Sequence, residues 1–261
     1  MAGVVHRSVD GSIGWLRLDN PERLNAISID MWRGLADSMA AFADDRSVRC
    51  VVITGCGDKA FASGADISEF ESQRSDPQGV AAYEDMATEA LNVVARIPKP
   101  VIAMIRGWCI GGGIALAMSC DLRIAAEDTR FSIPAARLGL GYEYPSLAKL
   151  TAIVGAANAR YMLYSGERFD AARGLRMNVI HEVVPVDALD DRVAALASSL
   201  AANAPLTIAA AKLAIDTALA DPLKRDIGAA EAAVRACYES ADYREGQRAF
   251  AEKRKPDFKG L

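Results

Sequence analysis

The chain has 261 residues, of which 51% are hydrophobic and 25% charged, and this composition is typical of a globular protein. The formal net charge is −4, with no basic block of the kind that binds nucleic acid and no run of roughly 18 apolar residues, so we expect neither a nucleic-acid nor a membrane partner. The five cysteines include no C-x-x-C pair and the first residues do not resemble a signal peptide, which favours reduced thiols and a cytoplasmic location.

The two histidines, His6 and His181, each lie beside a predicted strand and are distant in sequence from each other. We therefore expect structural or surface roles for both. Ser-His and Cys-His catalysis need a histidine next to the nucleophile, and most zinc sites need histidine or paired cysteine ligands. The sequence thus predicts no such catalytic pair and no metal site.

The first hundred residues predict a mixed α/β fold. Apolar alternation around the turn Asp10-Gly11 predicts a hairpin, and Ser28 is placed to cap a helix. Residues 71–78 are polar and include Pro77, and we expect this segment to be mobile. In chain order we predict strands at 4–8 and 14–18, a helix from 29 to about 43, a strand at 51–54, a glycine-containing turn at 60–67, and an amphipathic helix that ends before Pro98.

The remainder of the chain continues this alternation and then changes. We predict strands at 101–105, 122–125, 131–133 and 182–184, helices at 114–119, 146–154, 156–164 and 170–176, and an irregular segment at 134–145. From about residue 188 to 254 almost all patterns are helical and rich in alanine and arginine. We therefore predict an α/β core over residues 1–187 and a helical C-terminal region over 188–261.

Residues 107–113, with the sequence GWCIGGG, stand between two apolar runs and predict a buried strand, a tight turn and a buried helix. Successive glycines cost backbone entropy, which indicates a positive φ or a close approach. The N–H groups at a helix start favour negative charge. The turn is therefore predicted either to hold an anion, or an oxygen that becomes anionic in a reaction, or to serve close strand–helix packing alone.

Several segments, taken together and in order, resemble the enoyl-CoA hydratase/isomerase (crotonase) family over nearly the full length of the chain. The matching segments are 20–26, 51–55 with 60–67, 99–103 with 107–113, Cys120-Asp121, 138–140, and Arg244-Glu245-Gly246 with Phe250 and 252–256. The resemblance implies a spiral of ββα units with a helical C-terminus that forms trimers, often doubled to hexamers. It also implies an acyl-coenzyme A thioester as ligand, coenzyme A being part of the substrate and no separate cofactor being needed.

The resemblance assigns the two glycine turns a joint role, in which the backbone N–H groups of Ala65 and Gly112 hold the thioester oxygen. Two fixed donors favour the charged enolate oxygen over the neutral carbonyl, which is the physical requirement for catalysis here. Asp66 has an alternative role as a base. The positions that the resemblance implies for substrate or coenzyme A binding are Arg23, Leu24, Ala26, Ala65, Asp66, Ile67, Gly111, Gly112, Pro134, Leu138, Tyr142, Phe250 and Lys253, the last two in some members across a subunit boundary.

The chain departs from the family's hydratases at both catalytic glutamates, whose positions are occupied by Ala115 and Ala135. Water addition needs a group that activates water, and alanine cannot do this. Glu143 stands about where some family isomerases carry a catalytic carboxylate, and one carboxylate is sufficient to move a proton from C2 to C4 of a 3-enoyl thioester. We expect burial beside Leu140 and Tyr142 to raise the basicity of Glu143.

The resulting prediction is Δ3-Δ2-enoyl-CoA isomerisation with Glu143 as base, in fatty-acid or related carboxylic-acid metabolism. Glu143 has an alternative interpretation as a solvated loop carboxylate, and Tyr142 as a packing aromatic. Glu69 is a weaker candidate base. Alternative activities are hydration, decarboxylation or thioester hydrolysis by groups that the sequence does not reveal. An alternative of another class is a non-catalytic acyl-CoA-binding protein.

Overall fold

The computed structural model describes residues 3–66 and 77–261. The strands are β1 (Val4–Asp10), β2 (Ile13–Asp19), β3 (Cys50–Gly55), β4 (Ala60–Ala62), β5 (Val101–Ile105), β6 (Trp108–Ile110), β7 (Leu122–Ala126), β8 (Arg130–Ser132), β9 (Phe169–Asp170) and β10 (Glu182–Val184). The helices are α1 (Ile29–Asp44), α3 (Pro77–Arg96), α4 (Gly112–Ser119), α5 (Ala135–Leu138), α6 (Tyr144–Ser165), α7 (Ala171–Arg176), α8 (Leu189–Ala201), α9 (Pro205–Leu219), α10 (Ile227–Glu239) and α11 (Ala241–Ala251), with 3-10 turns η1 (Pro21–Arg23), η3 (Val186–Ala188) and η4 (Pro222–Lys224).

The strands form two sheets, one with the order β1-β2-β3-β5-β7-β10 and one with the order β4-β6-β8-β9. In the larger sheet only the β1–β2 hairpin is antiparallel, and the other pairs are parallel with helical crossovers. Side chains alternate along β5, so that Val101, Ala103 and Ile105 enter one core while Ile102 and Met104 enter another. This two-sided burial explains why the central strands are continuous apolar runs.

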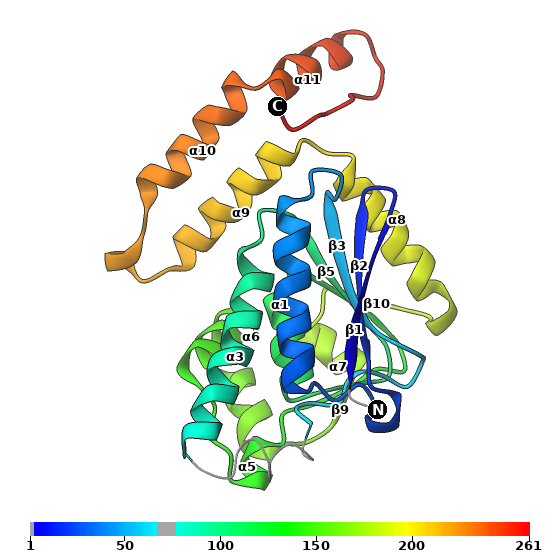
Figure 1. Cartoon of the computed structure of the whole chain (residues 1–261), viewed down its shortest axis with the longest axis vertical. Helices are drawn as coiled ribbons and strands as arrows, with labels where there is room; N and C mark the ends of the chain where they lie inside the picture. The colour runs from blue at the N-terminus through cyan, green and yellow to red at the C-terminus, as the bar shows by residue number, and fades with distance from the viewer. Residues whose placement is uncertain (1–2, 67–76) are drawn as a thin grey trace.

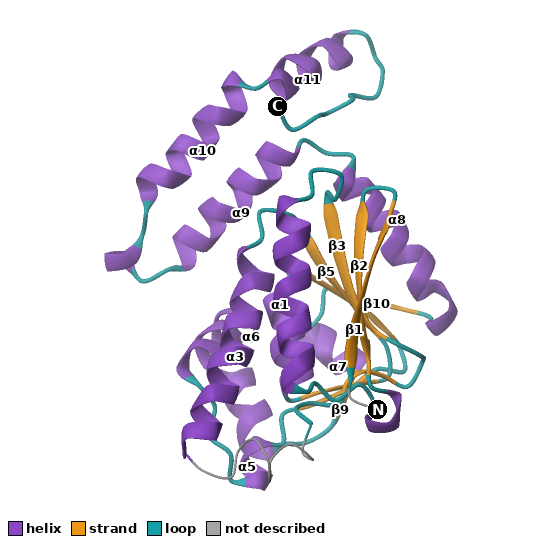
Figure 2. Ribbon diagram, viewed as in Figure 1, coloured by secondary structure: helices purple, strands orange, loops and turns teal. Residues whose placement is uncertain are grey.

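Helices cover both faces of the larger sheet (Figure 2). Helices α1 and α3 belong to the main core, and α8 packs on the opposite face through Leu189, Val193 and Ala197. Helices α9, α10 and α11 extend away from this body as an arm (Figure 1). The helical region expected from residue 188 therefore contains two kinds of helix: α8, which completes the core, and the arm, which leaves it.

Most of the predicted elements are confirmed, including the hairpin, the strand Glu182–Val184 and the Ser28 cap, whose side chain accepts a hydrogen bond from Met31 N. The prediction that residues 134–145 are irregular is partly wrong, because they contain α5 and the start of α6. The two helices predicted at 146–154 and 156–164 are confirmed: they share the label α6, but its backbone is not helical at Gly155, where φ is 77°. Short strands β4 and β6 inside the two glycine turns, and β9, were missed because two or three residues carry no periodicity.

Within residues 3–66 and 77–261, no single helix is long and apolar enough to cross a membrane. One bent pair, Val186–Ala201 with Pro205–Leu219, reaches that length and composition together, with an angle of 101° between its members.

Candidate active site

The two glycine turns lie side by side. Strands β4 and β6 pair in parallel, and each turn follows the end of its strand. In each turn a glycine with positive φ stands directly before the residue of interest: Gly64, at 116°, precedes Ala65, and Gly111, at 50°, precedes Gly112. A side chain at either glycine would strain the backbone, so these two positions require glycine for the turn itself.

The backbone N–H groups of Ala65 and Gly112 are left without a hydrogen bond in the part of the chain that the structure describes. The bridge between Ile27 and Ala65 uses the N–H groups of Ile27 and Asp66 instead. Gly112 is the first residue of α4, where the helix itself offers the N–H no partner. A Cβ atom at Gly112 would lie 3.5 Å from Ala65 N, so the absent side chain leaves open space beside that donor.

A cavity of about 200 Å³ adjoins both donors. Ala65 and Gly112 form part of one wall, α3 contributes Tyr83, and the segment after β8 forms the opposite side. Of the predicted site residues, the structure brings the following together around this cavity: Ala65, Gly111, Gly112, Pro134, Leu138, Tyr142 and Glu143. The positions of the two missing hydratase glutamates, Ala115 and Ala135, line the same cavity.

Glu143 lines the cavity but is exposed, and Leu140 is also exposed. The expected burial of Glu143 is therefore wrong. Glu143 is the residue before α6, in a stretch where Gly139 and Gly141 are also exposed, and only Tyr142 of this stretch is turned into the core. The carboxylate therefore stands at the rim of the cavity.

Tyr142 packs against the core and faces the cavity. Burial, with a smaller contribution from the charge of Glu84, raises the pKa of its phenol well above the ordinary value. The phenol is therefore held in its neutral form, as a hydrogen-bond donor. Within the described residues this hydroxyl has no hydrogen-bond partner, so it is available to a ligand in the cavity.

Glu84 is a carboxylate at the cavity that the sequence analysis missed. It lies on α3, three residues before Ala87 and seven before Leu91, and all three residues line the cavity. The apolar face that predicted this helix, extended back by one turn, points to position 84. A charged residue on the buried stripe of an amphipathic helix is the signal that would have found it.

The loop at residues 20–26, which is expected to bind coenzyme A, is hydrogen-bonded to the glycine turn at 60–67. Asp66 is 6% exposed and accepts hydrogen bonds from Arg23 Nη1 at 2.9 Å and from Asn20 Nδ2 at 3.4 Å. These contacts favour a positioning role for Asp66 over a role as a base. Leu24 has a positive φ of 52°, Ala26 is buried, and Ile67 and Glu69 lie outside the described residues.

Phe250 and Lys253 are not brought to this cavity within one chain. Phe250 is 88% exposed and borders a separate cavity between α9, α10 and α11. The adjoining motif has a structural role, because Glu245 accepts hydrogen bonds from Arg254 Nη2 at 3.0 Å and from Asp257 N at 3.1 Å. These contacts hold the C-terminal segment against α11.

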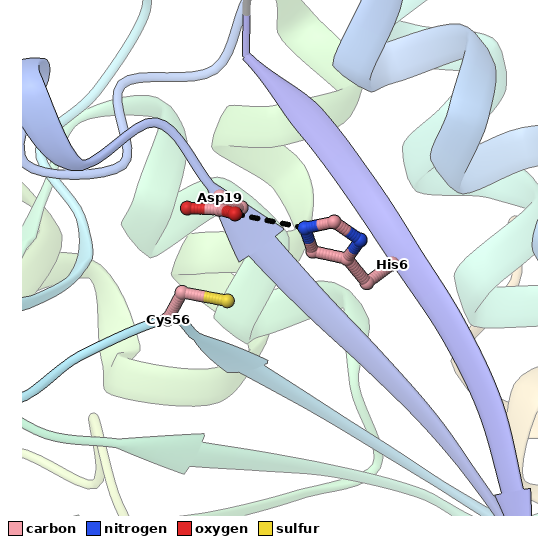
Figure 3. Close-up of side chains that lie close together, drawn as sticks. All are labelled: His6, Asp19 and Cys56. Atoms are coloured by element: carbon pink, nitrogen blue, oxygen red, sulfur yellow. Dashed lines mark hydrogen bonds and ion pairs between the residues drawn. The ribbon is translucent and has the colours of Figure 1, made fainter.

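Both histidines have local hydrogen-bond partners, as expected. His181 Nδ1 accepts from Arg123 N at 3.1 Å. His6 Nε2 lies 2.8 Å from Asp19 Oδ2, with Cys56 beside the pair (Figure 3). The three potential ligand atoms lie within 4.8 Å of one another, but burial and the charge of Asp19 raise the pKa of the Cys56 thiol. The group is therefore best described as a hydrogen-bonded His6–Asp19 pair with a neighbouring cysteine.

Comparison with known proteins agrees with this geometry. Residues 8–261 match the family model described as enoyl-CoA hydratase/isomerase. The chain belongs to this family. It is 30% identical to the crotonyl-CoA hydratase of Syntrophomonas wolfei, with 93% of each chain covered, and 33% identical to the methylmalonyl-CoA decarboxylase of Escherichia coli, with 91% of each covered.

A solved structure of the family supports the fold directly. The crystal structure of an enoyl-CoA hydratase/carnithine racemase from Magnetospirillum magneticum superimposes with a TM-score of 0.93 at 38% identity, covering 100% of this chain and 97% of that one. The mixed α/β fold expected from the resemblance is therefore confirmed. The chain is an acyl-CoA enzyme of the enoyl-CoA hydratase/isomerase family.

Proposed function

We propose that the protein is a Δ3-Δ2-enoyl-CoA isomerase with Glu143 as its base. One observation carries this proposal: Glu143 lines the same cavity as the free N–H groups of Ala65 and Gly112, while both hydratase glutamate positions in that cavity are alanine. The cavity thus combines an oxyanion-holding pair with a carboxylate at its rim. These are the parts that a proton shift beside a thioester requires.

In this reaction Glu143 removes a proton from C2 of a 3-enoyl thioester. The electron pair of that C–H bond moves toward the thioester carbonyl, and the oxygen that becomes negative accepts hydrogen bonds from Ala65 N–H and Gly112 N–H. Glu143 then returns the proton to C4, which leaves the double bond between C2 and C3. The two N–H donors bind the charged intermediate better than the neutral substrate, so they accelerate the reaction and do not merely bind its substrate.

Hydration is a second candidate, favoured by one specific observation. Glu84 lines the cavity from α3, so that two carboxylates, Glu84 and Glu143, border the space beside the oxyanion donors. Relatives such as the crotonyl-CoA hydratase of Syntrophomonas wolfei carry hydratase names. Hydration needs one group that activates water and one that delivers a proton, and a pair of carboxylates can do both. Glu84 would supply the second carboxylate in place of the glutamates that are missing at positions 115 and 135.

We also propose that the arm assembles the chain into a homotrimer, or into a hexamer made of two such trimers. Helices α9 and α10 expose apolar side chains that a monomer leaves in water, among them Ile215 at 59% and Ile227 at 60%. Assembly through these faces would bury them. In such a trimer Phe250 and Lys253 are candidates to close the nucleotide end of a neighbouring chain's site, with Arg23, Leu24, Ala26 and Ile67 contributing from the same chain.

The test compares wild type and Glu143→Gln on trans-3-hexenoyl-CoA and on crotonyl-CoA. We expect isomerisation of the first substrate, reduced by about 10²- to 10⁴-fold in the variant, because the amide cannot accept the proton. Glu127→Gln is the matched control, since Glu127 is an exposed carboxylate on the turn after β7. This control variant should retain the wild-type rate.

Other outcomes separate the alternatives. Rapid hydration of crotonyl-CoA that depends on Glu84 would replace the isomerase by a hydratase. Loss of carbon dioxide from methylmalonyl-CoA, with no turnover of either enoyl thioester, would favour the decarboxylase alternative. Tight binding of acyl-CoA without any turnover would favour the alternative that the protein binds acyl-CoA without catalysis.

A further inference from the structure

A second, smaller cavity of about 40 Å³ adjoins the first beyond Tyr142. The two share wall residues, among them Leu91, Ala115 and Tyr142. A space of this size is sufficient for one small polar group, since a water molecule needs about 10–15 Å³ of such volume. The main cavity therefore continues into a second, partly open space with room for a terminal group of the ligand.

A few polar side chains stand within the mainly apolar lining of the small cavity. Lys149, Ser119 and Asn92 all line the small cavity, and Lys149 Nζ donates to Ser119 Oγ at 3.3 Å. Lys149 is half-buried, and this burial lowers the pKa of its ammonium. In the part of the chain that the structure describes, no carboxylate forms an ion pair with Lys149. An ammonium group at the end of a largely apolar pocket is thus left to be completed by a ligand.

The surrounding charges favour an anion at this place. Two further cations, Lys212 and Arg96, and the carboxylate of Asp216 act on Lys149 through space. Lys212 is already paired with Asp121 at 2.9 Å. Three cations against two carboxylates leave an excess positive charge, so Asp216 alone does not balance the group. A structural role, in which Asp216 and Ser119 suffice for Lys149, is the competing interpretation.

We propose that the acyl group of the substrate ends in a carboxylate that binds to Lys149 and Ser119. The substrate is then the mono-coenzyme A thioester of a short dicarboxylic acid, with its thioester at Ala65 and Gly112 and its free carboxylate in the small cavity. Tyr142, which lines both cavities, lies beside the chain between the two ends. This inference rests on the proposed thioester site but not on which reaction follows there.

The experiment measures binding of saturated thioesters, which cannot isomerise, by titration calorimetry on the full-length protein. The ligands are adipoyl-CoA, hexanoyl-CoA and 6-hydroxyhexanoyl-CoA, which share six acyl carbons and differ at the far end. We expect adipoyl-CoA to bind at least about tenfold more tightly than the other two, because hydrogen bonds to a charged group are the strong ones. Lys149→Met should abolish this preference and leave hexanoyl-CoA binding unchanged, while Lys149→Arg should retain most of it.

The outcomes distinguish the two levels of the argument. Equal binding of adipoyl-CoA and hexanoyl-CoA by wild type would overturn the carboxylate subsite and leave the thioester site standing. A preference for adipoyl-CoA that survives Lys149→Met in a protein with an unchanged melting curve would also overturn it. Tight binding of 6-hydroxyhexanoyl-CoA would show that charge is not recognised. If no thioester bound at all, both the subsite and the proposed function would be wrong.

Discussion

The two walls of the cavity are built in different ways. The glycine wall consists of Gly64, Ala65, Gly111 and Gly112, and its functional atoms are backbone N–H groups. Positive φ angles and the β4–β6 pairing fix it against the buried core, with Gly64 buried and the other three residues half-buried. Nearby, a Cβ at Gly113 would collide with the Ala62 carbonyl, so this wall also depends on close packing. The interpretation of the glycine turn as close packing is therefore confirmed at Gly113, while its interpretation as an anion or oxyanion site at Gly112 stays a prediction.

The side-chain wall consists of Glu84, Leu138, Leu140, Tyr142 and Glu143. It is partly exposed, comes from α3 and from the segment before α6, and acts through its side chains. Most substitutions leave a backbone N–H donor in place, whereas any substitution replaces the side chain itself. Under the proposed function, the glycine wall would determine which intermediate is stabilised, and the side-chain wall would determine which reaction that intermediate undergoes.

The strongest test of this division blocks the glycine wall with Gly112→Val. Gly112 does not have a positive φ, so valine is tolerated by the backbone, but its Cβ would lie 3.5 Å from Ala65 N and fill the place of the thioester oxygen. We expect kcat/KM to fall by at least about 10²- to 10³-fold for every thioester reaction of the protein, as when an oxyanion donor is lost. Steady-state kinetics on each accepted substrate measures this.

Gly34→Ala is the matched control for that change. A Cβ at Gly34 would lie at a similar distance, 3.5 Å, from Val5, but α1 carries this residue away from the cavity. Activity should be unchanged, and stability should rise slightly because alanine favours a helix. Unimpaired turnover in Gly112→Val would show that the oxyanion is held elsewhere.

A smaller effect is expected from Glu84→Gln on the side-chain wall. If Glu143 alone moves the proton, removing the Glu84 charge changes isomerisation by less than about tenfold, well below the effect of Glu143→Gln. Steady-state kinetics of both variants on the same substrate measures this difference. Equal losses in Glu84→Gln and Glu143→Gln would mean that the two carboxylates act as a pair.

The sequence predicted the glycine wall better than the side-chain wall, and the reason is physical. Glycines at 64 and 111 are needed because of their backbone angles, which the residue type reveals directly. The position of Glu84 at the cavity depends on how α3 packs against other elements. The residues next to Glu84 in the sequence do not reveal this packing. The exposure of Glu143 depends on where α6 begins, and helix starts are the least certain part of a sequence-based prediction.

In the fold, too, features set by local sequence were predicted and features set by packing were missed. Strands with two buried faces, such as β5, were predicted because they are uniformly apolar. The two-residue strand β9 exists only through its pairing with β8, so no local signal marks it. The packing of α8 on the sheet was also invisible, because an amphipathic helix does not reveal which face of which layer it covers.

The smallest predicted effect lies outside both walls, at Glu245 in the arm. Hydrogen bonds from Arg254 and Arg248 hold the pKa of this carboxyl well below its ordinary value of 4.5. A carboxylate with a lowered folded-state pKa stabilises the fold above its unfolded-state pKa, and this stability is lost as pH falls below about 4.5. We expect Glu245→Gln to lower the melting temperature by a few degrees near pH 7, and the difference from wild type to shrink as the solution is acidified through and below that range. Calorimetric melting at several pH values measures it, with Glu252→Gln, an exposed partner of the same Arg254, as the milder control. A difference that stays constant with pH would show that shape at position 245, not charge, stabilises the C-terminal segment.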